Sequence, residues 1–312
     1  MKAEHDQFVW GSLKTLCQGF GFTEGPLWHP DGRLVFQDVR EAKTLAWSPN
    51  TGVVSVRADT GGANGQTFDN RGLIVFCEGA SQAHGGRRRV GRVEEGGTVS
   101  TVADRWNGRR LNAPNDIVAN RDGQLYFTNP RHIIQEEDLD IPYSAVYRID
   151  PDGLVTETTA IMSLPNGLAF SPDEKILYVA NTRPDPMILA YDVDDRGNLG
   201  NERLVLELPV APEAPKWNPM LPDGIKVDIE GRLYVSAPGG VWVADHTGEV
   251  LSILRTPEWV TNLAFGDDDG MTLFLTCRDR VCSVRTRTPG IRPAGEAVAR
   301  PLVMVNNESL LS

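Results

Sequence analysis

The feature that most constrains the fold of this chain is a unit that recurs six times along it. Each copy has a polar residue, usually a small residue next, a short apolar run, a turn rich in Asp and Gly, and a second apolar run. The copies lie 38 to 57 residues apart and begin at Glu24, Asn64, Asn115, Asn166, Asp223 and Thr261. A hairpin repeated at this period indicates blades arranged around an axis.

The residues after each hairpin complete a larger unit. A third short run follows each copy, as in AVYRIDPDG, and in five copies a fourth run follows, as in RLVLELP. These runs combine β-branched and aromatic residues and are bounded by Asp, Asn, Gly and Pro, which is typical of strands and turns. No segment has an apolar period of helical length. The sequence therefore predicts an all-β fold, a six-bladed β-propeller of four antiparallel strands per blade, with residues 1–312 as one domain.

The last copy lacks an evident fourth strand after Arg287. The N-terminal run FVWGSLKTLC lies directly before the first copy and has a suitable length to supply that strand. We expect the segment around Leu13–Cys17 to pair as the outer strand of the last blade. Such pairing would close the ring and remove an exposed sheet edge.

The first position of every copy carries a side-chain oxygen. At a single copy, Asn or Asp is more often a turn residue than a functional one. All six positions follow the pattern, however, and Glu24 is a poor turn former. Equivalent positions on the innermost strands of a propeller form a ring around its axis. Such a ring of neutral and anionic oxygens suits a hard cation such as Ca²⁺ or Mg²⁺. The pattern predicts one divalent metal cation in the central channel.

Composition excludes several other functions. The net charge of −11 argues against nucleic acid or an anionic membrane as partner, since both bind basic surfaces. We find no secretory signal and no transmembrane stretch, and expect a cytoplasmic protein. The G-x-S-x-G and G-x-x-x-x-G-K-[ST] motifs are absent.

The run of three arginines at 87–89 is expected to lie in a solvated hairpin, with contact to an anionic substrate as the alternative. Four cysteines are expected to be free thiols, with a Cys277–Cys282 bridge as the alternative.

Four motifs give a more specific indication: EGPLW, RLNAPND, LPNGLAFSPDEKILYVANT and LPDGIKVDIEGRLYVSAPGGVWV. From about Phe22 to Arg285 the chain closely resembles the SMP-30/gluconolactonase/LRE-like family of sugar-lactone hydrolases. The resemblance implies a six-bladed propeller with a divalent metal in the channel, often Ca²⁺. It also implies metal ligands at Glu24, Asn166 and Asp223, with Asn115 as a ligand or a substrate contact. Asn64, Asn112 and Thr261 are further candidates for the substrate pocket.

This reading predicts a metal-dependent lactonase that opens a lactone, of gluconolactone type, to the hydroxy acid. The cation would polarise the lactone carbonyl and activate water, Asp223 would take the proton, and Asn115 would orient the substrate. A phosphotriester or fluorophosphate hydrolase, a calcium- or ligand-binding propeller without activity, and an interaction scaffold are the alternatives. Mg²⁺, Mn²⁺, Zn²⁺ and Fe²⁺ also tolerate oxygen ligands. The oligomeric state stays open.

Two segments depart from the family pattern: Gly79–Arg89 and Arg131–Pro142. The first is longer and lacks a His after its Glu, and the second contains the acidic run QEEDLD. Specificity usually resides in loops of this kind. We therefore expect both segments to border the channel mouth and to determine which lactone is hydrolysed.

Overall fold

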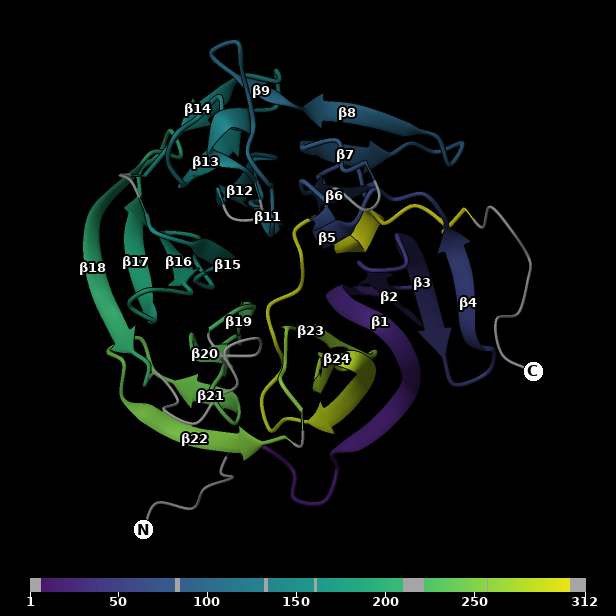
Figure 1. Ribbon diagram of the computed structural model, residues 1–312. Coiled ribbons are helices and arrows are strands. Elements are labelled where there is room, and N and C mark those ends of the chain that lie inside the picture. Colours follow the sequence, from purple (N-terminus) through teal and green to yellow (C-terminus); the bar gives the residue numbers. More distant parts are fainter. Residues whose placement is uncertain are drawn as a thin grey trace.

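The computed structural model describes residues 7–81, 85–131, 134–159, 162–209, 222–256 and 258–303. Strands surround a central axis, with the outermost strands at the rim (Figure 1). These ranges also contain two short 3₁₀ helices, η2 (Glu136–Asp138) and η3 (Glu296–Val298), and no helix in them has the length and apolar character needed to cross a membrane. The strands are β1 (Lys14–His29), β2 (Arg33–Asp38), β3 (Lys43–Ser48), β4 (Gly52–Arg57), β5 (Ala63–Phe68), β6 (Ile74–Glu78), β7 (Arg89–Val93), β8 (Val99–Ala103), β9 (Arg105–Trp106), β10 (Arg109–Arg110), β11 (Ile117–Ala119), β12 (Leu125–Asn129), β13 (Ala145–Ile149), β14 (Val155–Glu157), β15 (Pro165–Phe170), β16 (Ile176–Asn181), β17 (Met187–Val193), β18 (Leu199–Glu207), β19 (Ile225–Val227), β20 (Leu233–Ala237), β21 (Gly240–Ala244), β22 (Val250–Arg255), β23 (Asn262–Gly266) and β24 (Thr272–Arg285).

The strands form five large antiparallel sheets in the described part of the chain, and β9 and β10 form a separate ribbon. Four sheets have four strands each, in the orders β5–β6–β7–β8, β11–β12–β13–β14, β15–β16–β17–β18 and β19–β20–β21–β22. The fifth has six strands, in the order β23–β24–β1–β2–β3–β4. The prediction of an all-β propeller is confirmed, but the prediction of six separate four-stranded sheets is wrong. The physical reason is that β1, with 16 residues, is long enough to pair with the last repeat and then with the first, while β24, with 14 residues, contains two consecutive runs of the last repeat, so that the strands of both repeats form one sheet.

The six-stranded sheet joins the two ends of the chain. In its first part β1 pairs with β24, where Thr15 is opposite Cys282 and Cys17 is opposite Val281. In its last part β1 pairs with β2, where Leu27 is opposite Val35. The register shifts between these parts, so that β1 changes partner along its length.

The innermost strands contact one another in a ring that passes from β1 through β5, β11, β15, β19 and β23 and returns to β1. Each of the six repeats contributes one of them. Backbone hydrogen bonds join several neighbours: the Gly167 amide donates to the Asp223 carbonyl at 3.0 Å, and the Gly224 amide donates to the Thr261 carbonyl at 2.9 Å. A Cβ atom on Gly167 would overlap the Asp223 carbonyl oxygen. The small second residue of the repeat thus permits this close approach.

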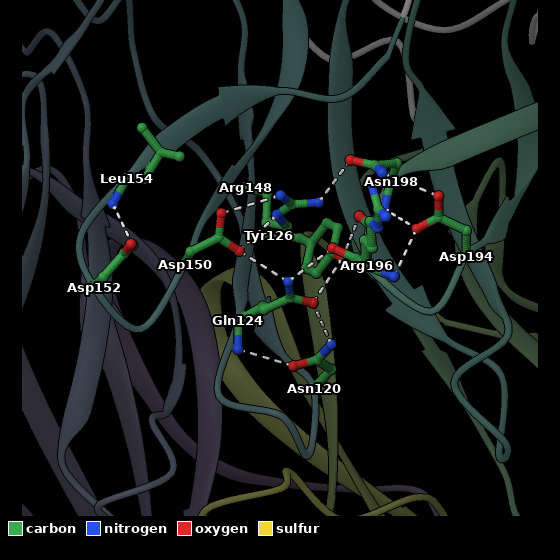
Figure 2. Close-up of polar contacts among 11 residues, drawn as sticks. Asn120, Gln124, Tyr126, Arg148, Asp150, Asp152, Leu154, Asp194, Arg196 and Asn198 are labelled. Carbon is green, nitrogen blue, oxygen red and sulfur yellow. Dashed lines mark hydrogen bonds and ion pairs between the residues drawn. The ribbon is translucent and has the colours of Figure 1, made fainter.

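Apolar side chains fill the space between neighbouring sheets, and polar contacts fasten their outer ends. Between the third and fourth repeats, Tyr126 packs edge-on against Phe170 with ring centroids 5.2 Å apart. The Tyr126 hydroxyl donates to the Gly197 carbonyl at 2.6 Å, and Arg148 Nη1 donates to Asn198 Oδ1 at 3.1 Å. These contacts, drawn in part in Figure 2, join the β11–β14 sheet to the β15–β18 sheet.

The segment 289–303 crosses the ends of the inner strands that lie away from the first repeat positions (Figure 1). The Ile291 amide donates to the Val227 carbonyl at 2.9 Å, and the Arg300 amide donates to the Gly72 carbonyl at 2.8 Å. A cavity of about 90 Å³ lies beside this segment, and its lining includes Phe265 and Lys226. Repeat analysis did not anticipate this crossing, because the segment belongs to no repeat.

Candidate active site

The first positions of the repeats meet at one end of the ring of inner strands. Glu24 and Asn166 lie within β1 and β15, while Asn115 and Asp223 lie two residues before β11 and β19. Glu24, Asn115 and Asp223 are buried, with 3%, 9% and 6% of their surface exposed. The four predicted metal-site residues thus come from four of the six repeats of one ring, the first, third, fourth and fifth.

Glu24 is a buried carboxyl with two donors on one oxygen. Its Oε2 accepts from the Gly25 amide at 3.0 Å and from Nδ2 of Asn262 at 3.2 Å. Burial raises the pKa of Glu24 to about 7, the Gly25 amide opposes the rise, and the negative charge of Asp116 adds to it. The ionised form of Glu24 is thus destabilised unless a positive charge lies nearby.

Asp223 has a similar environment. Burial raises the pKa of Asp223 well above its usual range, and the charges of Glu24 and Asp116 raise it further. A hydrogen bond from the Asn166 side chain opposes this rise. Asn166 Nδ2 also donates to Thr182 Oγ1 at 3.2 Å, and Thr182 in turn donates to the Pro222 carbonyl at 2.9 Å. The two predicted ligands Asn166 and Asp223 are therefore in direct contact.

Asp116 is a third buried carboxyl in this group, and sequence reasoning missed it. It is 3% exposed, and its charge acts on both Glu24 and Asp223. A signal was present in the repeat: the second position is Gly in four copies, but Asp116 in the third copy and Asn262 in the sixth. Positions three repeats apart lie across a ring of six, and these two side chains meet, with Asn262 Nδ2 3.4 Å from Asp116 Oδ2.

The charge of the group fits a cation. Three carboxyls lie together with one ammonium, that of Lys226, whose Nζ donates to Asn262 Oδ1 at 3.5 Å. Buried carboxylates in this excess need a compensating positive charge. Within the described ranges no three His, Cys, Asp or Glu side chains are arranged to hold a metal. Amide oxygens such as those of Asn115 and Asn166 would thus have to complete a shell around Glu24 and Asp223.

The other candidate pocket residues differ in their surroundings. Thr261 is fully buried, and its hydroxyl donates to the Thr23 carbonyl at 2.7 Å, which ties the last repeat to the first. Asn112 is also fully buried, and its Nδ2 donates to the Tyr143 carbonyl at 2.8 Å while its Oδ1 has no hydrogen-bond partner. Asn64 lies in β5 and is partly exposed. Asn112 thus retains an unused acceptor, whereas the Thr261 hydroxyl is engaged in the fold.

The two segments that depart from the family pattern contact one another near Asn112. Arg88 Nε donates to the Asn112 carbonyl at 3.0 Å, and Arg88 Nη1 donates to the Asp138 carbonyl at 3.2 Å. The Arg110 amide donates to Asp140 Oδ2 at 2.8 Å. A hollow of about 450 Å³ lies between the segments. Residues 82–84 and 132–133 of these segments lie outside the described ranges.

The expectation of a solvated arginine hairpin at 87–89 holds for Arg87, which is exposed, but is wrong for Arg88 and Arg89. Arg87 and Arg89 both pair with Glu78, at 2.8 and 2.9 Å, and Glu78 is fully buried. Arg88 is itself 7% exposed and bonds to backbone carbonyls. A buried carboxylate requires such partners, so the run has a structural role.

The four cysteines, Cys17, Cys77, Cys277 and Cys282, are free thiols. The alternative of a Cys277–Cys282 bridge is not realised. These two thiols are instead hydrogen-bonded to each other, which raises the pKa of Cys277 well above its usual range and lowers that of Cys282 to about 7.

The fold and the site together define a β-propeller with a buried, carboxylate-rich group at one end of its axis. The chain belongs to the SMP-30/Gluconolactonase/LRE-like region family, whose sequence profile matches residues 22–278. It is 33% identical over 294 residues to a gluconolactonase of Zymomonas mobilis, which covers 89% of this chain and 82% of that one. It is 29% identical over 263 residues to the pentonolactonase XacC of Haloferax volcanii, with 81% and 80% covered. The solved structure of the gluconolactonase XC5397 from Xanthomonas campestris superimposes with a TM-score of 0.79 at 31% identity, over 90% of this chain and 91% of that one.

Proposed function

We propose that this protein hydrolyses a sugar lactone of gluconolactone type and uses one divalent cation, with Ca²⁺ as the preferred ion. The observation that carries the proposal is the pair of buried carboxyls of Glu24 and Asp223, with the Asn166 side chain in contact with Asp223, at one end of the inner strands in a chain of this family. Both named relatives in the sequence comparison are lactonases, one for gluconolactone and one for pentonolactone. Their names support the lactone as substrate class.

Glu24, Asn166 and Asp223 would hold the cation, with Asn115 completing the site. Oxygen donors of this kind are those that hard cations prefer. When bound, the cation supplies Lewis acidity toward the lactone carbonyl, where negative charge develops in the transition state. Its positive charge would offset those of the Glu24 and Asp223 carboxylates, which would then stay ionised despite their burial.

Asp223 would also act as the general base. Its carboxylate would accept a proton from the attacking water as the new bond to the carbonyl carbon forms, and would return that proton to the ring oxygen as the ring C–O bond breaks to give the hydroxy acid. The Asn115 side chain would orient the lactone, and the Oδ1 of Asn112, which has no hydrogen-bond partner, would accept from a substrate hydroxyl. Burial around the carboxyls limits access of bulk water to the reacting atoms.

Turnover of a panel of aldonolactones, an aromatic lactone and a phosphotriester tests the proposal, each with added Ca²⁺ and with EDTA. We expect hydrolysis of an aldonolactone that EDTA abolishes and a divalent cation restores. Turnover of the phosphotriester alone would contradict the proposed lactonase activity and indicate a phosphotriester hydrolase. Metal binding without turnover of any compound would indicate a metal-binding propeller without enzymatic activity.

Further proposals concern the molecule as a whole. We propose that it is a single cooperative domain closed by pairing of the N-terminal strand with β24, and that it works in the cytoplasm. Four free thiols are typical of a reducing compartment. The net charge of −11 supports a small-molecule substrate in place of nucleic acid or an anionic membrane.

A further inference from the structure

We propose that Asn262 is a positioning residue that holds the Glu24 carboxylate in the orientation needed to bind the cation. Asn262 lies at the start of β23, in the sixth repeat, and is 2% exposed. The inference rests on the proposed function, since it concerns the same site. It assigns a role to a residue outside the predicted ligands.

The contacts of Asn262 place its amide between two carboxyls. Nδ2 is 3.2 Å from Glu24 Oε2 and 3.4 Å from Asp116 Oδ2. A single amide group thus donates toward both acidic side chains. An N–H donor between two carboxylates stabilises their ionised forms and limits their movement.

The contacts of the amide oxygen of Asn262 determine the orientation of this side chain. Oδ1 of Asn262 accepts from the Leu263 amide at 2.9 Å, and Lys226 Nζ approaches the same oxygen at 3.5 Å. A flipped amide would direct its oxygen at two carboxyls and its NH₂ group at two donors. Only one orientation therefore satisfies all the neighbours.

The backbone makes room for this arrangement. A Cβ atom at Gly224 would overlap Asn262 Oδ1, and a Cβ atom at Gly65 would overlap Asp116 Oδ1. Each larger side chain at the second repeat position thus lies against a glycine of a neighbouring repeat. Asn262 therefore reaches Glu24 in a fixed geometry, and the loss of its side chain would leave Glu24 Oε2 with only the Gly25 amide as donor.

The test is calorimetric titration of the metal-free protein with Ca²⁺ alone. Partners that orient metal ligands typically contribute about 10- to 100-fold to metal affinity. We expect Asn262→Ala to raise the Kd for Ca²⁺ by about that factor. Saturating Ca²⁺ should then restore lactone turnover, because Asn262 acts through Glu24 and touches no substrate. Asn262→Ser, whose hydroxyl is too short to reach Glu24, is a second variant in case the alanine variant does not fold.

Asn120→Ala is the matched control. Asn120 is 5% exposed and its side chain makes two hydrogen bonds to Gln124, at 2.8 and 2.9 Å, in the turn at the other end of β11 from Asn115 and Asp116 (Figure 2). It should lower the melting temperature without changing the Kd. An unchanged Kd for Ca²⁺ in the folded Asn262 variants would overturn the role of Asn262 but not the proposed metal site. Failure of the native protein to bind Ca²⁺, Mg²⁺, Mn²⁺ or Zn²⁺ would overturn the metal site of the proposed function, and the inference with it.

Discussion

At the residue scale, burial decides what the acidic side chains can do. Glu24, Asp116 and Asp223 would be ordinary ionised carboxylates at the surface, but each is less than 7% exposed here. Close approach of like charges and loss of water make ionisation of Glu24 and Asp223 costly without a cation. The same residues would be weak metal ligands if they lay apart on a flexible chain.

Asp223 is the residue at which binding and proton transfer can be separated. Asp223→Asn keeps the size of the side chain and one oxygen ligand but removes the basic oxygen. Loss of a general base typically lowers the rate by about 10²–10⁴. We therefore expect a metal-loaded Asp223→Asn protein with strongly reduced kcat at every metal concentration.

Glu24→Gln serves as the comparison for Asp223→Asn. It should weaken metal binding, and excess metal should partly restore its rate, because Glu24 is proposed only to hold the cation. Metal content is measured beside kcat in both variants. Near-normal turnover by fully loaded Asp223→Asn would show that Asp223 is a ligand and not the base.

At the element scale, the long strand β1 connects parts of the chain that are distant in sequence. Its first residues pair with β24, and Phe8, ahead of it, packs edge-on against Tyr234 with centroids 6.0 Å apart. Phe8 is 2% exposed. Without this segment one edge of β24 would be unpaired, and the apolar surface around Tyr234 would face water.

Deletion of residues 1–18 should therefore destabilise the fold. Loss of strand pairing together with a buried aromatic side chain costs several kcal/mol, which corresponds to a fall in melting temperature of at least about 5 °C. Phe8→Ala should give a smaller fall, since it keeps the backbone pairing. A melting temperature that does not change on deletion would mean that the ring closes in some other way.

The segments Gly79–Arg89 and Arg131–Pro142 are the elements expected to determine substrate choice. Arg88 links their described parts to the Asn112 carbonyl, three residues before Asn115. We expect exchange of both segments for those of a gluconolactonase relative to shift the ratio of kcat/KM values among lactones. Exchange of the turn 121–123, at the other end of β11, is the control and should leave that ratio unchanged. Equal ratios in both chimaeras would remove the segments from substrate choice.

At the scale of the whole molecule, the buried carboxyls of Glu24 and Asp223 make the stability of the fold depend on pH. The pKa of Glu24 is raised from 4.5 to about 7 in the folded state. Between these values the folded protein retains a proton that the unfolded chain has released, so stability falls as pH rises through this window. Asp223, whose pKa is also raised, acts in the same direction.

We expect the melting temperature in EDTA to fall between about pH 5 and about pH 8. Saturating Ca²⁺ should raise it most at the higher pH, because the cation binds the ionised carboxyls. Glu24→Gln should show a shallower fall in EDTA. A melting temperature that rises over the same range in EDTA would contradict the assignment of Glu24 as a carboxyl destabilised by ionisation.

The sequence by itself determined the strand hairpins, their sixfold repetition and the first repeat positions, because alternating apolar runs and Asp–Gly turns are local signals. It also predicted that the N-terminal segment pairs with the last repeat, but it did not reveal that β1 and β24 are continuous strands which join the first and last repeats in one sheet, since strand pairing across the whole chain depends on which edges meet in space. The roles of Asp116, Asn262 and Lys226, and the burial of Arg88, also depended on the tertiary structure. A side chain at the second position of one repeat becomes part of the site only when the ring brings it opposite its counterpart three repeats away, against a glycine that leaves room for it.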